Sequence, residues 1–218
     1  MRFEIKVCFA PHHAGTIDAW LAAHPDAFRS TFAPRRVNNV YFDTPDLQAF
    51  AENLAGVSRR CKVRLRWYGA DDLPERGTLE LKHKHGTLGW KDSFAIEAPY
   101  VSGDSWADVH RRIRAQLPRD VRREFDEHPR ATLLNRYHRR YLESADRVLR
   151  VTLDTDQQMF DQTRARSPNL RRRSHIPDVH VLELKCEAED RRRAVRALAS
   201  CPVRVTRFSK YAIGVELR

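Results

Sequence analysis

The sequence feature that most constrains the fold is a strict alternation of charged and apolar residues, repeated in several short segments. In CKVRLRWYG, from Cys61 to Gly69, three cations occupy every second position and apolar residues lie between them. The same spacing is present in RFEIKV, TLELKHK, HVLELK and LRVTLD. Because successive side chains of a β-strand point to opposite faces, each segment predicts a strand with one charged face and one apolar face.

Segments with this two-residue period outnumber those with helical spacing, which predicts an α+β protein that is mainly antiparallel β. Strands are predicted over residues 2–9, 37–43, 61–68, 77–85, 92–97, 133–143, 147–154, 179–186 and 203–211. Helical spacing begins near Thr16, recurs in residues 104–117 with Asp104 as the N-cap, and recurs again in residues 189–200. Residues 162–178 lack any apolar period and are predicted to form a basic loop. No change in composition marks a domain boundary, so we expect one domain over residues 1–218, built as a closed, tunnel-like β-barrel with a few flanking helices.

The composition indicates that the binding partners of this protein are anionic. The formal net charge of +11 favours a nucleic acid, a phosphate-rich small molecule, polyphosphate or an anionic membrane surface. No apolar run approaches the ~20 residues that span a bilayer, and the charged N-terminal segment is not typical of a signal peptide, so we expect no membrane insertion. The four cysteines, Cys8, Cys61, Cys186 and Cys201, form no CxxC pair and no metal-ligand cluster in the sequence, which indicates reduced thiols in a cytoplasmic protein.

The charged strand faces favour a phosphate-binding interior. Each single strand is explained by an ordinary solvated face, but Arg and Lys recur at nearly every polar position of several strands. The tripeptide Glu-x-Lys also recurs with aliphatic neighbours, at Glu4–Lys6, Glu80–Lys82 and Glu183–Lys185. If the strands close into a barrel, these like charges need a polyanion and a divalent cation to neutralise them. Arg and Lys bind phosphate oxygens, and carboxylates bind Mg²⁺ or Mn²⁺.

Eight stretches occur in the order found in one known family and span nearly the whole chain: RFEIK, VNNVYFDTPDLQAFAEN, KVRLRWYG, LELKHK followed by Lys91, LLNRY, RVTLDT, VLELK and FSKY. On these stretches the chain resembles the VTC (vacuolar transporter chaperone) polyphosphate polymerase domain of the triphosphate tunnel metalloenzyme, or CYTH-like, superfamily. The resemblance implies a tunnel of antiparallel strands and a divalent cation, Mn²⁺ or Mg²⁺, as cofactor.

The resemblance also implies roles for individual residues. The cations that would line the tunnel and hold phosphates are Lys6, Arg64, Arg66, Lys82, Lys91, Arg136, Arg150 and Lys210. Of these, the implied catalytic residues are Arg64, Arg66, Lys82, Arg136 and Lys210. Ser209 would donate a hydrogen bond to phosphate, and Tyr137 is a further candidate beside Arg136. Glu183 would bind the metal, with Glu4 and Glu80 as second candidates for the metal or for orienting lysines.

Two motifs have a structural interpretation instead. Asp43 and Thr44 in YFDTPD are predicted to end a strand in a turn and to bond local backbone. The histidines, including His83 and His85, show no metal-site spacing and receive no role.

The implied activity is phosphoryl transfer from ATP, or another triphosphate, to inorganic polyphosphate or pyrophosphate. The first alternative is an inorganic or organic triphosphatase of the same superfamily, whose members commonly begin with Glu-x-Glu-x-Lys. Arg2 stands at the first glutamate position here, which favours the polymerase. The second alternative is a non-catalytic binder of polyphosphate or RNA, for which Trp67, Tyr68 and the basic loop are suited. No nucleic-acid-binding motif is present, so we expect no nucleic acid partner, and whether a membrane protein is a partner stays open.

Overall fold

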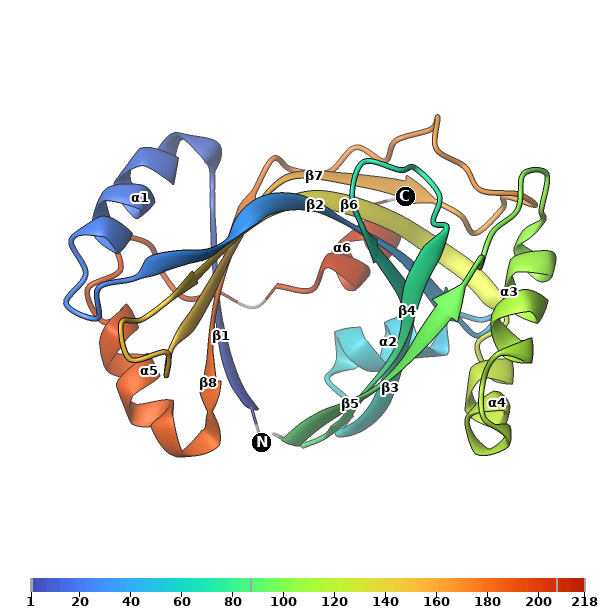
Figure 1. Cartoon of the computed structure of the whole chain (residues 1–218), viewed down its shortest axis with the longest axis horizontal. Helices are drawn as coiled ribbons and strands as arrows, with labels where there is room; N and C mark the ends of the chain where they lie inside the picture. Colours follow the sequence, from blue (N-terminus) through green and yellow to red (C-terminus); the bar gives the residue numbers. More distant parts are fainter. Residues whose placement is uncertain (1, 87, 207, 218) are drawn as a thin grey trace. The chain divides into compact units, whose positions relative to one another are not determined.

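The centre of the fold is one eight-stranded antiparallel sheet, described for residues 2–86, 88–206 and 208–217 of a computed structural model (Figure 1). The strand order is β1-β8-β7-β6-β2-β3-β4-β5. The strands are β1 (Arg2–Phe9), β2 (Arg29–Asp43), β3 (Arg59–Tyr68), β4 (Arg76–His85), β5 (Leu88–Glu97), β6 (Arg130–Glu143), β7 (Arg150–Asp161) and β8 (His180–Glu187). The helices are α1 (Ala14–Ala22), α2 (Gln48–Ala55), α3 (Trp106–Ala115), α4 (Arg119–Asp126), α5 (Arg191–Leu198) and α6 (Lys210–Glu216), with 3-10 turns η1 (Pro11–His13) and η2 (Ala188–Asp190). The predicted α+β, mainly antiparallel fold class is confirmed.

The structure differs from the predicted closed barrel in one respect, because the sheet is open in the described part of the chain. β1 and β5 are its edge strands, and closure needs a hydrogen-bonded ladder between first and last strands. The outer edge of β1 is instead occupied by the segment around Thr206. The Thr206 N–H donates to the Lys6 carbonyl at 3.0 Å, and the Cys8 N–H donates to the Thr206 hydroxyl at 2.9 Å.

The structure divides into two compact units, which are described separately. The first unit comprises Met1–Arg36, Tyr137–Gln157 and Pro177–Ser209. The second unit comprises Val37–Arg136, Gln158–Ile176 and Lys210–Arg218. The long strands β2, β6 and β7 contribute residues to both units.

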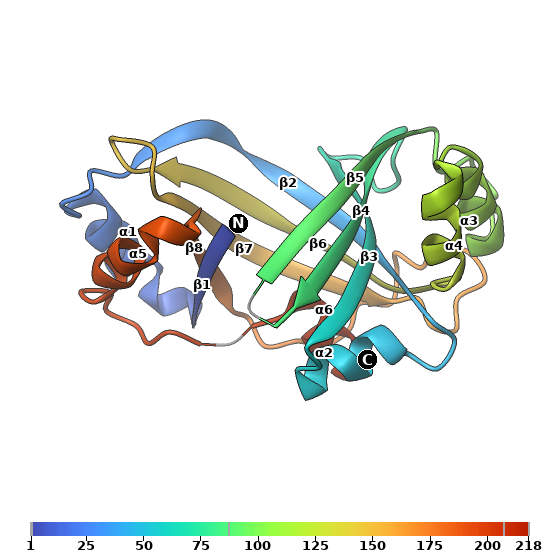
Figure 2. The ribbon, with the colours of Figure 1, turned by 90° about the horizontal axis from the view of Figure 1, so that it is seen from below.

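In the first unit, α1 and α5 cover the apolar face of β1, β8 and β7 (Figure 2). Ile17 of α1 and Leu198 of α5 pack in one buried cluster with Val7, Leu184 and Val151 from the three strands. The alternation predicted from the sequence therefore assigns the opposite face of these strands to the charged residues.

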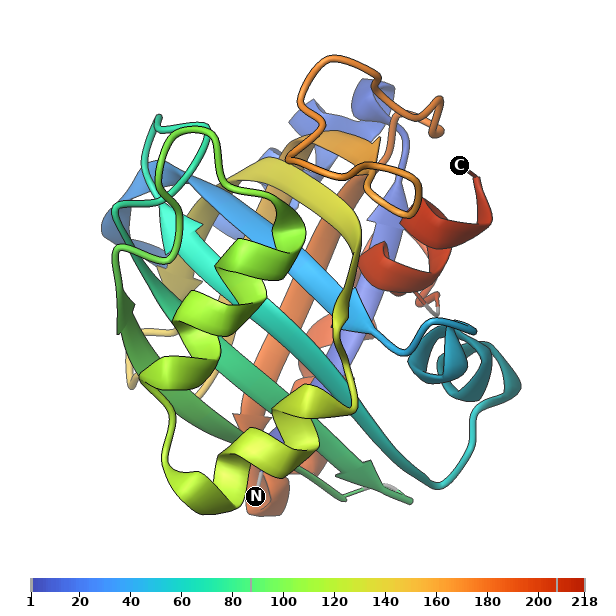
Figure 3. The ribbon, with the colours of Figure 1, turned by 90° about the vertical axis from the view of Figure 1, so that its right-hand side faces the viewer.

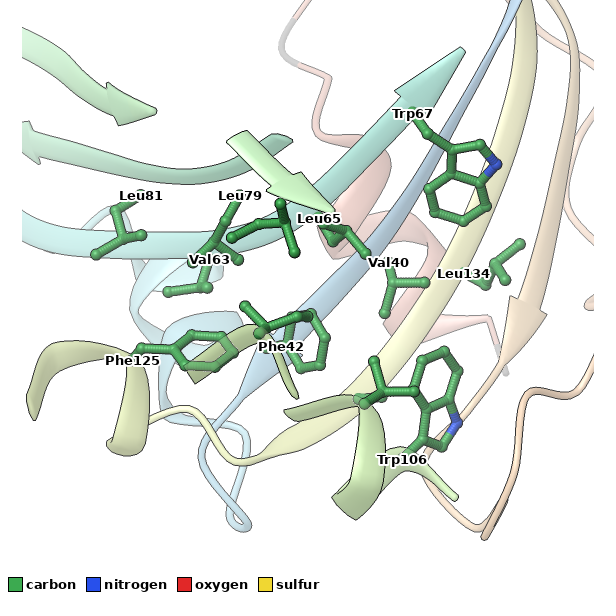
Figure 4. Packing of buried hydrophobic residues seen from close by; sticks show 14 of the residues in the cluster. Val40, Phe42, Val63, Leu65, Trp67, Leu79, Leu81, Trp106, Phe125 and Leu134 are labelled. Atoms are coloured by element: carbon green, nitrogen blue, oxygen red, sulfur yellow. The ribbon is translucent and has the colours of Figure 1, made fainter. Parts of the chain in front are cut away.

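In the second unit, α3 and α4 cover the apolar face of β2, β3 and β4 (Figure 3). Phe42 lies at the centre of this cluster, with Val63 and Leu79 from the neighbouring strands (Figure 4). Its ring meets Trp106 of α3 edge-on at a centroid distance of 6.4 Å and Phe125 of α4 at 5.6 Å. Burying this face against the helices again leaves the cationic positions of the strands on the other face.

The helices include the main departures from the sequence prediction. The predicted strand over residues 203–211 is wrong, because Val205 makes only an isolated bridge with Val7 and α6 begins at Lys210; residue 207 lies outside the described residues. α2 and α4 were not predicted, since in α4 only Phe125 is buried and no apolar stripe is present. The N-cap of α3 is Ser105, which forms a capping box with Asp108.

Within the described ranges, no helix is long and apolar enough to cross a membrane.

Candidate functional site

The first unit carries a cluster of alternating acids and bases on its polar face. This first cluster consists of Glu4, Lys6, Arg139, Asp154, Glu183 and Lys185. The register of β1 and β8 places Glu4 opposite Lys185 and Lys6 opposite Glu183. The Lys6 Nζ lies 3.0 Å from Glu4 Oε1 and 3.4 Å from Glu183 Oε1. The Lys185 Nζ lies 2.6 Å from Glu183 Oε2 and 3.5 Å from Glu4 Oε2, so two lysines bridge the same two carboxylates.

The first cluster is buried enough for these charges to depend on one another. Glu183 is only 7% exposed. Burial works against the charged form of Lys6, but the carboxylates of Glu183 and Glu4 outweigh it and raise the pKa of Lys6 above its usual range. The cluster therefore holds its lysine charged and in a fixed place on the sheet.

Arg139 belongs to the first cluster and was missed by the sequence interpretation, which assigned Arg136 to this role. Its Nε donates to Asp154 Oδ1 at 2.5 Å and its Nη2 donates to Asp154 Oδ2 at 2.7 Å. The Arg139 Nη2 also lies 3.8 Å from Glu183 Oε2. The guanidinium stands 5.2 Å from the ring centre of Tyr137, so this predicted residue supports Arg139.

Arg136 lies elsewhere on β6. It stacks on Phe160, 5.0 Å from the ring centre, and its Nη1 donates to Asp72 at 2.7 Å. Leu134, two residues earlier on the same strand, and Phe160 both belong to the core beneath α3. Because residues two apart on a strand share a face, Arg136 lies on the apolar side of the sheet in its unit. The structure does not bring Arg136 together with Arg64 and Arg66.

Two other predicted residues lie at the margin of the first cluster. Ser209 follows Phe208, whose carbonyl accepts a hydrogen bond from the Lys6 Nζ at 3.2 Å. Arg150 is opposite Lys185 in the register of β7 and β8. Its side chain is more than a third exposed, and its Nη2 lies 3.9 Å from Glu187 Oε1. Ser209 is thus near Lys6, whereas Arg150 lies at the exposed end.

The second unit carries a different cluster, in which three cations gather on one buried carboxylate. This second cluster consists of Arg64, Arg66, Glu80 and Lys91. The Arg64 Nε donates to Glu80 Oε2 at 2.6 Å, and the Lys91 Nζ donates to Glu80 Oε1 at 2.6 Å. The Arg66 Nη1 lies 4.0 Å from Glu80 Oε2, and its Nε donates to Asn39 at 2.9 Å.

Glu80 acts as the internal counter-ion of the second cluster. Its carboxylate is 3% exposed. Burial opposes its ionisation, but the charges of Arg64 and Arg66 outweigh burial and hold the pKa of Glu80 below its usual range. Both carboxylate oxygens receive short hydrogen bonds, so Glu80 orients Arg64 and Lys91, the second of the two roles predicted for it.

A row of three lysines runs across β3, β4 and β5 and includes Lys91 of the second cluster. The registers of β3, β4 and β5 place Lys62 opposite Lys82, and Lys82 opposite Lys91. Like charges directly opposite each other destabilise a sheet unless an anion is shared between them. Three lysines therefore lie in one row across this face of the second unit, next to Arg64 and Arg66.

Lys210 is held in the second unit by its neighbour Tyr211. The Tyr211 ring stacks on Tyr41 at a centroid distance of 4.8 Å, and the Arg64 Nη1 donates to the Tyr41 hydroxyl at 3.4 Å. The Tyr211 hydroxyl donates to Asp43, and burial followed by the Asp43 charge raises the pKa of Tyr211 above its usual range. Lys210 begins a helix, not a strand, yet the tyrosine pair joins that helix to the face that carries Arg64.

The turn at Asp43 is confirmed as a structural element. The Asp43 carboxylate accepts hydrogen bonds from the backbone N–H groups of Thr44 at 2.7 Å, Ala49 at 2.8 Å and Phe50 at 3.0 Å. It therefore satisfies amides at the start of α2 and also fixes α6 through Tyr211.

The carboxylates differ in how well they are placed to bind a divalent cation. Mg²⁺ and Mn²⁺ are bound through oxygen ligands, commonly one or two carboxylates together with substrate phosphates. Glu4 and Glu183 fit this pattern, because they share the same two lysines and so lie side by side. The Thr152 hydroxyl, opposite Glu183 in the β7–β8 register, is buried without a hydrogen-bond partner among the described residues. Glu80 fits less well, since both of its oxygens are held by cations.

Two solved structures have a fold similar to that of this chain. A candidate adenylate cyclase from Bacillus halodurans has 13% sequence identity and a TM-score of 0.56, over 96% of this chain and 94% of that chain. A candidate adenylate cyclase from Vibrio parahaemolyticus has 9% identity and a TM-score of 0.53, over 97% of both chains. At these identities the likeness concerns the fold alone.

The family follows from the sequence comparison. The model of the VTC domain matches residues 1–218, so the chain belongs to the VTC domain family. No curated protein matches the chain by sequence.

Proposed function

We propose that this protein is a metal-dependent polyphosphate polymerase that uses ATP. The terminal oxygen of a phosphate chain attacks the γ-phosphorus of ATP, the bond from that phosphorus to the β,γ-bridging oxygen breaks, and ADP leaves. Membership of the VTC domain family supports this substrate class. The observation that carries the proposal is the row of three lysines beside Arg64 and Arg66, a concentration of positive charge that an extended polyanion would neutralise.

The second cluster is suited to holding phosphates during transfer. Phosphoryl transfer depends on positioning and on stabilising the charge of the phosphoryl oxygens more than on covalent chemistry. Arg64 and Lys91 are already oriented by Glu80, and Arg66 by Asn39, so little reorganisation is needed when a phosphate binds. The planar guanidinium groups bind two phosphate oxygens at once, and the lysines act as point charges.

The first cluster is suited to a phosphate that arrives with a metal ion. Glu183, with Glu4 beside it, would hold Mg²⁺ or Mn²⁺, and the bound ion would neutralise charge on the phosphate oxygens. Lys6, Lys185 and Arg139 would then turn part of their hydrogen bonding from these carboxylates to phosphate. The attacking phosphate oxygen is already ionised near neutral pH, so the reaction requires no strong general base.

The test is to incubate the pure protein with ATP and Mn²⁺ or Mg²⁺, with and without pyrophosphate as primer, and to resolve the products by gel. Long phosphate chains are the expected product. Free phosphate alone, from ATP or tripolyphosphate, would replace the proposal with a triphosphatase. Neither product, together with tight polyphosphate binding, would replace it with a non-catalytic binder.

A further inference from the structure

A second set of metal-ligating side chains lies on the other face of the strands in the second unit. Cys61 of β3 is directly opposite His83 of β4. Glu124 comes from α4, which packs against the apolar face of the strands (Figure 3). One ligand atom from each of the three residues lies within 4.8 Å of the others. We propose that Cys61, His83 and Glu124 bind a transition-metal ion of the Zn²⁺ class, separately from the phosphate chemistry.

The His83 ring is oriented as a metal ligand requires. Its Nδ1 lies 3.4 Å from Glu124 Oε1, on the side of the cluster, whereas its Nε2 lies 3.1 Å from Asp92 Oδ2. The ring also stacks on Trp90 at a centroid distance of 5.0 Å and an interplanar angle of 14°. Metal-bound histidines typically donate their second ring N–H to a carboxylate, which fixes the tautomer. Asp92 occupies that position, so the Nδ1 is left for the metal ion on the side of Glu124.

The donor set selects the kind of ion. Zn²⁺ binds thiolate, imidazole and carboxylate ligands in tetrahedral sites, whereas Mg²⁺ and Mn²⁺ prefer oxygen ligands. Zn²⁺ binds the thiolate form of cysteine, so binding would displace the Cys61 thiol proton. A divalent ion that displaces this proton balances the charges of one thiolate and one carboxylate.

The site leaves one coordination position open. The three ligands line a cavity of about 700 Å³, to which His128, Trp90 and residues of α2 also contribute. Three protein ligands with an open fourth position are typical of zinc sites that bind a water molecule or a small ligand. The cavity gives an ion a route of entry and gives that fourth ligand a place.

This site shares no side chain with the second cluster. Lys82 and Lys84 alternate with His83 along β4, so they lie on the opposite face of the strand from it. A zinc-class ion at Cys61 and a magnesium-class ion at Glu183 are therefore distinguishable by the ligand chemistry that each ion reports.

Cobalt titration of the reduced, full-length protein tests the site, because Co²⁺ bound to a thiolate gives a charge-transfer absorption that oxygen ligands do not give. We expect one equivalent of Co²⁺ to produce this absorption and Zn²⁺ to remove it by competition. Cys61→Ser should abolish the absorption, and Asp92→Asn should weaken Co²⁺ binding by about 10–100-fold. Cys201→Ser and Glu183→Gln are the matched controls and should keep it.

A second measurement uses the unaltered protein, so its result does not depend on whether the variants fold. Zn²⁺ should slow the reaction of Cys61 with a thiol reagent by at least about tenfold, as identified by peptide mapping, and leave the rate at Cys201 unchanged. Absence of the charge-transfer absorption at one equivalent of Co²⁺, or its persistence in Cys61→Ser, would overturn the proposal. Equal reactivity of Cys61 with and without Zn²⁺ would do the same.

Discussion

The two polar clusters use the same kinds of residue in opposite proportions. The first cluster sets three carboxylates against three cations, and each lysine is shared between the same two glutamates. The second cluster sets three cations against one carboxylate, whose two oxygens are both bonded. The first is balanced before any ligand binds, whereas the second has an excess of positive charge.

For the proposed reaction, this difference predicts that the two clusters have different roles. A balanced cluster gains little from phosphate alone, because the phosphate must compete with carboxylates for the same cations; a divalent ion on those carboxylates removes the competition. A cluster with excess cations binds phosphate directly and needs no metal. Metal dependence should therefore reside in the first cluster, and most of the affinity for the phosphate chain in the second.

The largest expected effect comes from removing the carboxylate of the first cluster that is proposed to bind the metal ion. Glu183→Gln should lower the rate of phosphoryl transfer by about 10³-fold, because the amide is a poor ligand for Mg²⁺ or Mn²⁺. Polyphosphate affinity should stay within about threefold, since the second cluster is intact. The measurements are steady-state turnover and equilibrium binding of polyphosphate.

Glu187→Gln is the control on the same strand, because Glu187 is half exposed and lies 3.9 Å from Arg150, outside the first cluster. Its turnover should match that of the unaltered protein. Equal losses of affinity and turnover in Glu183→Gln would remove the proposed division between the clusters.

The second cluster should respond in stability, because its cations depend on one buried carboxylate. Glu80→Gln should lower the free energy of unfolding by about 3 kcal/mol, since it leaves buried cations without their counter-ion. Urea denaturation at neutral pH measures this change. Glu97→Gln, which breaks an exposed ion pair with Arg76, should change it by less than about 0.5 kcal/mol. Similar effects of the two substitutions would show that Glu80 is not the counter-ion of the cluster.

Binding of the phosphate chain should depend on Arg66, which can be removed without leaving Glu80 unpaired. Arg66→Met should weaken polyphosphate binding by about tenfold, the loss of one charge-assisted contact. The unfolding free energy should change little, since Arg64 and Lys91 still bond Glu80. Isothermal titration at fixed salt gives the affinity, with Arg76→Met as an exposed control on β4. An unchanged affinity in Arg66→Met would contradict the proposed role of the second cluster.

The smallest effect is the pH dependence of stability. The pKa of Glu80 is depressed in the folded protein, so its contribution is fully present above the unfolded pKa of about 4.3 and is lost as pH falls towards the folded value. The difference in unfolding free energy between the unaltered protein and Glu80→Gln should therefore shrink below about pH 4. Denaturation curves at pH 7 and pH 3.5 measure it, and a constant difference would contradict the depressed pKa.

The strands could be predicted because alternation is a local property of the sequence. The segments RFEIKV, KVRLRWY, TLELKHK and HVLELK all lie in strands, and most of their apolar residues are buried. Phe3 and Ile5 are only partly buried, and Tyr68 at the end of β3 is exposed. The helices α2 and α4 could not be predicted in this way. The eight-residue α4 buries a single side chain, so its position depends on the core that Phe125 enters.

The site could be predicted only where the sequence shows which face of a strand each side chain occupies. Glu80 and Arg64 belong to segments whose parity is clear, and the structure places them in contact. The segment LLNRYHRRYL contains three arginines, and the sequence does not say which one shares a face with Glu183; the structure places Arg139 beside it. The cluster at Cys61 and His83 was missed because its third member, Glu124, is brought there by a helix far along the chain.

The most direct test follows the γ-phosphate of ATP. The protein is incubated with ATP labelled at that position, Mg²⁺ or Mn²⁺ and a pyrophosphate primer, and the label in chains is separated from the label in orthophosphate. The account predicts that most of the label enters chains of increasing length, with one ADP formed for each phosphate added. Label found only as orthophosphate would contradict it.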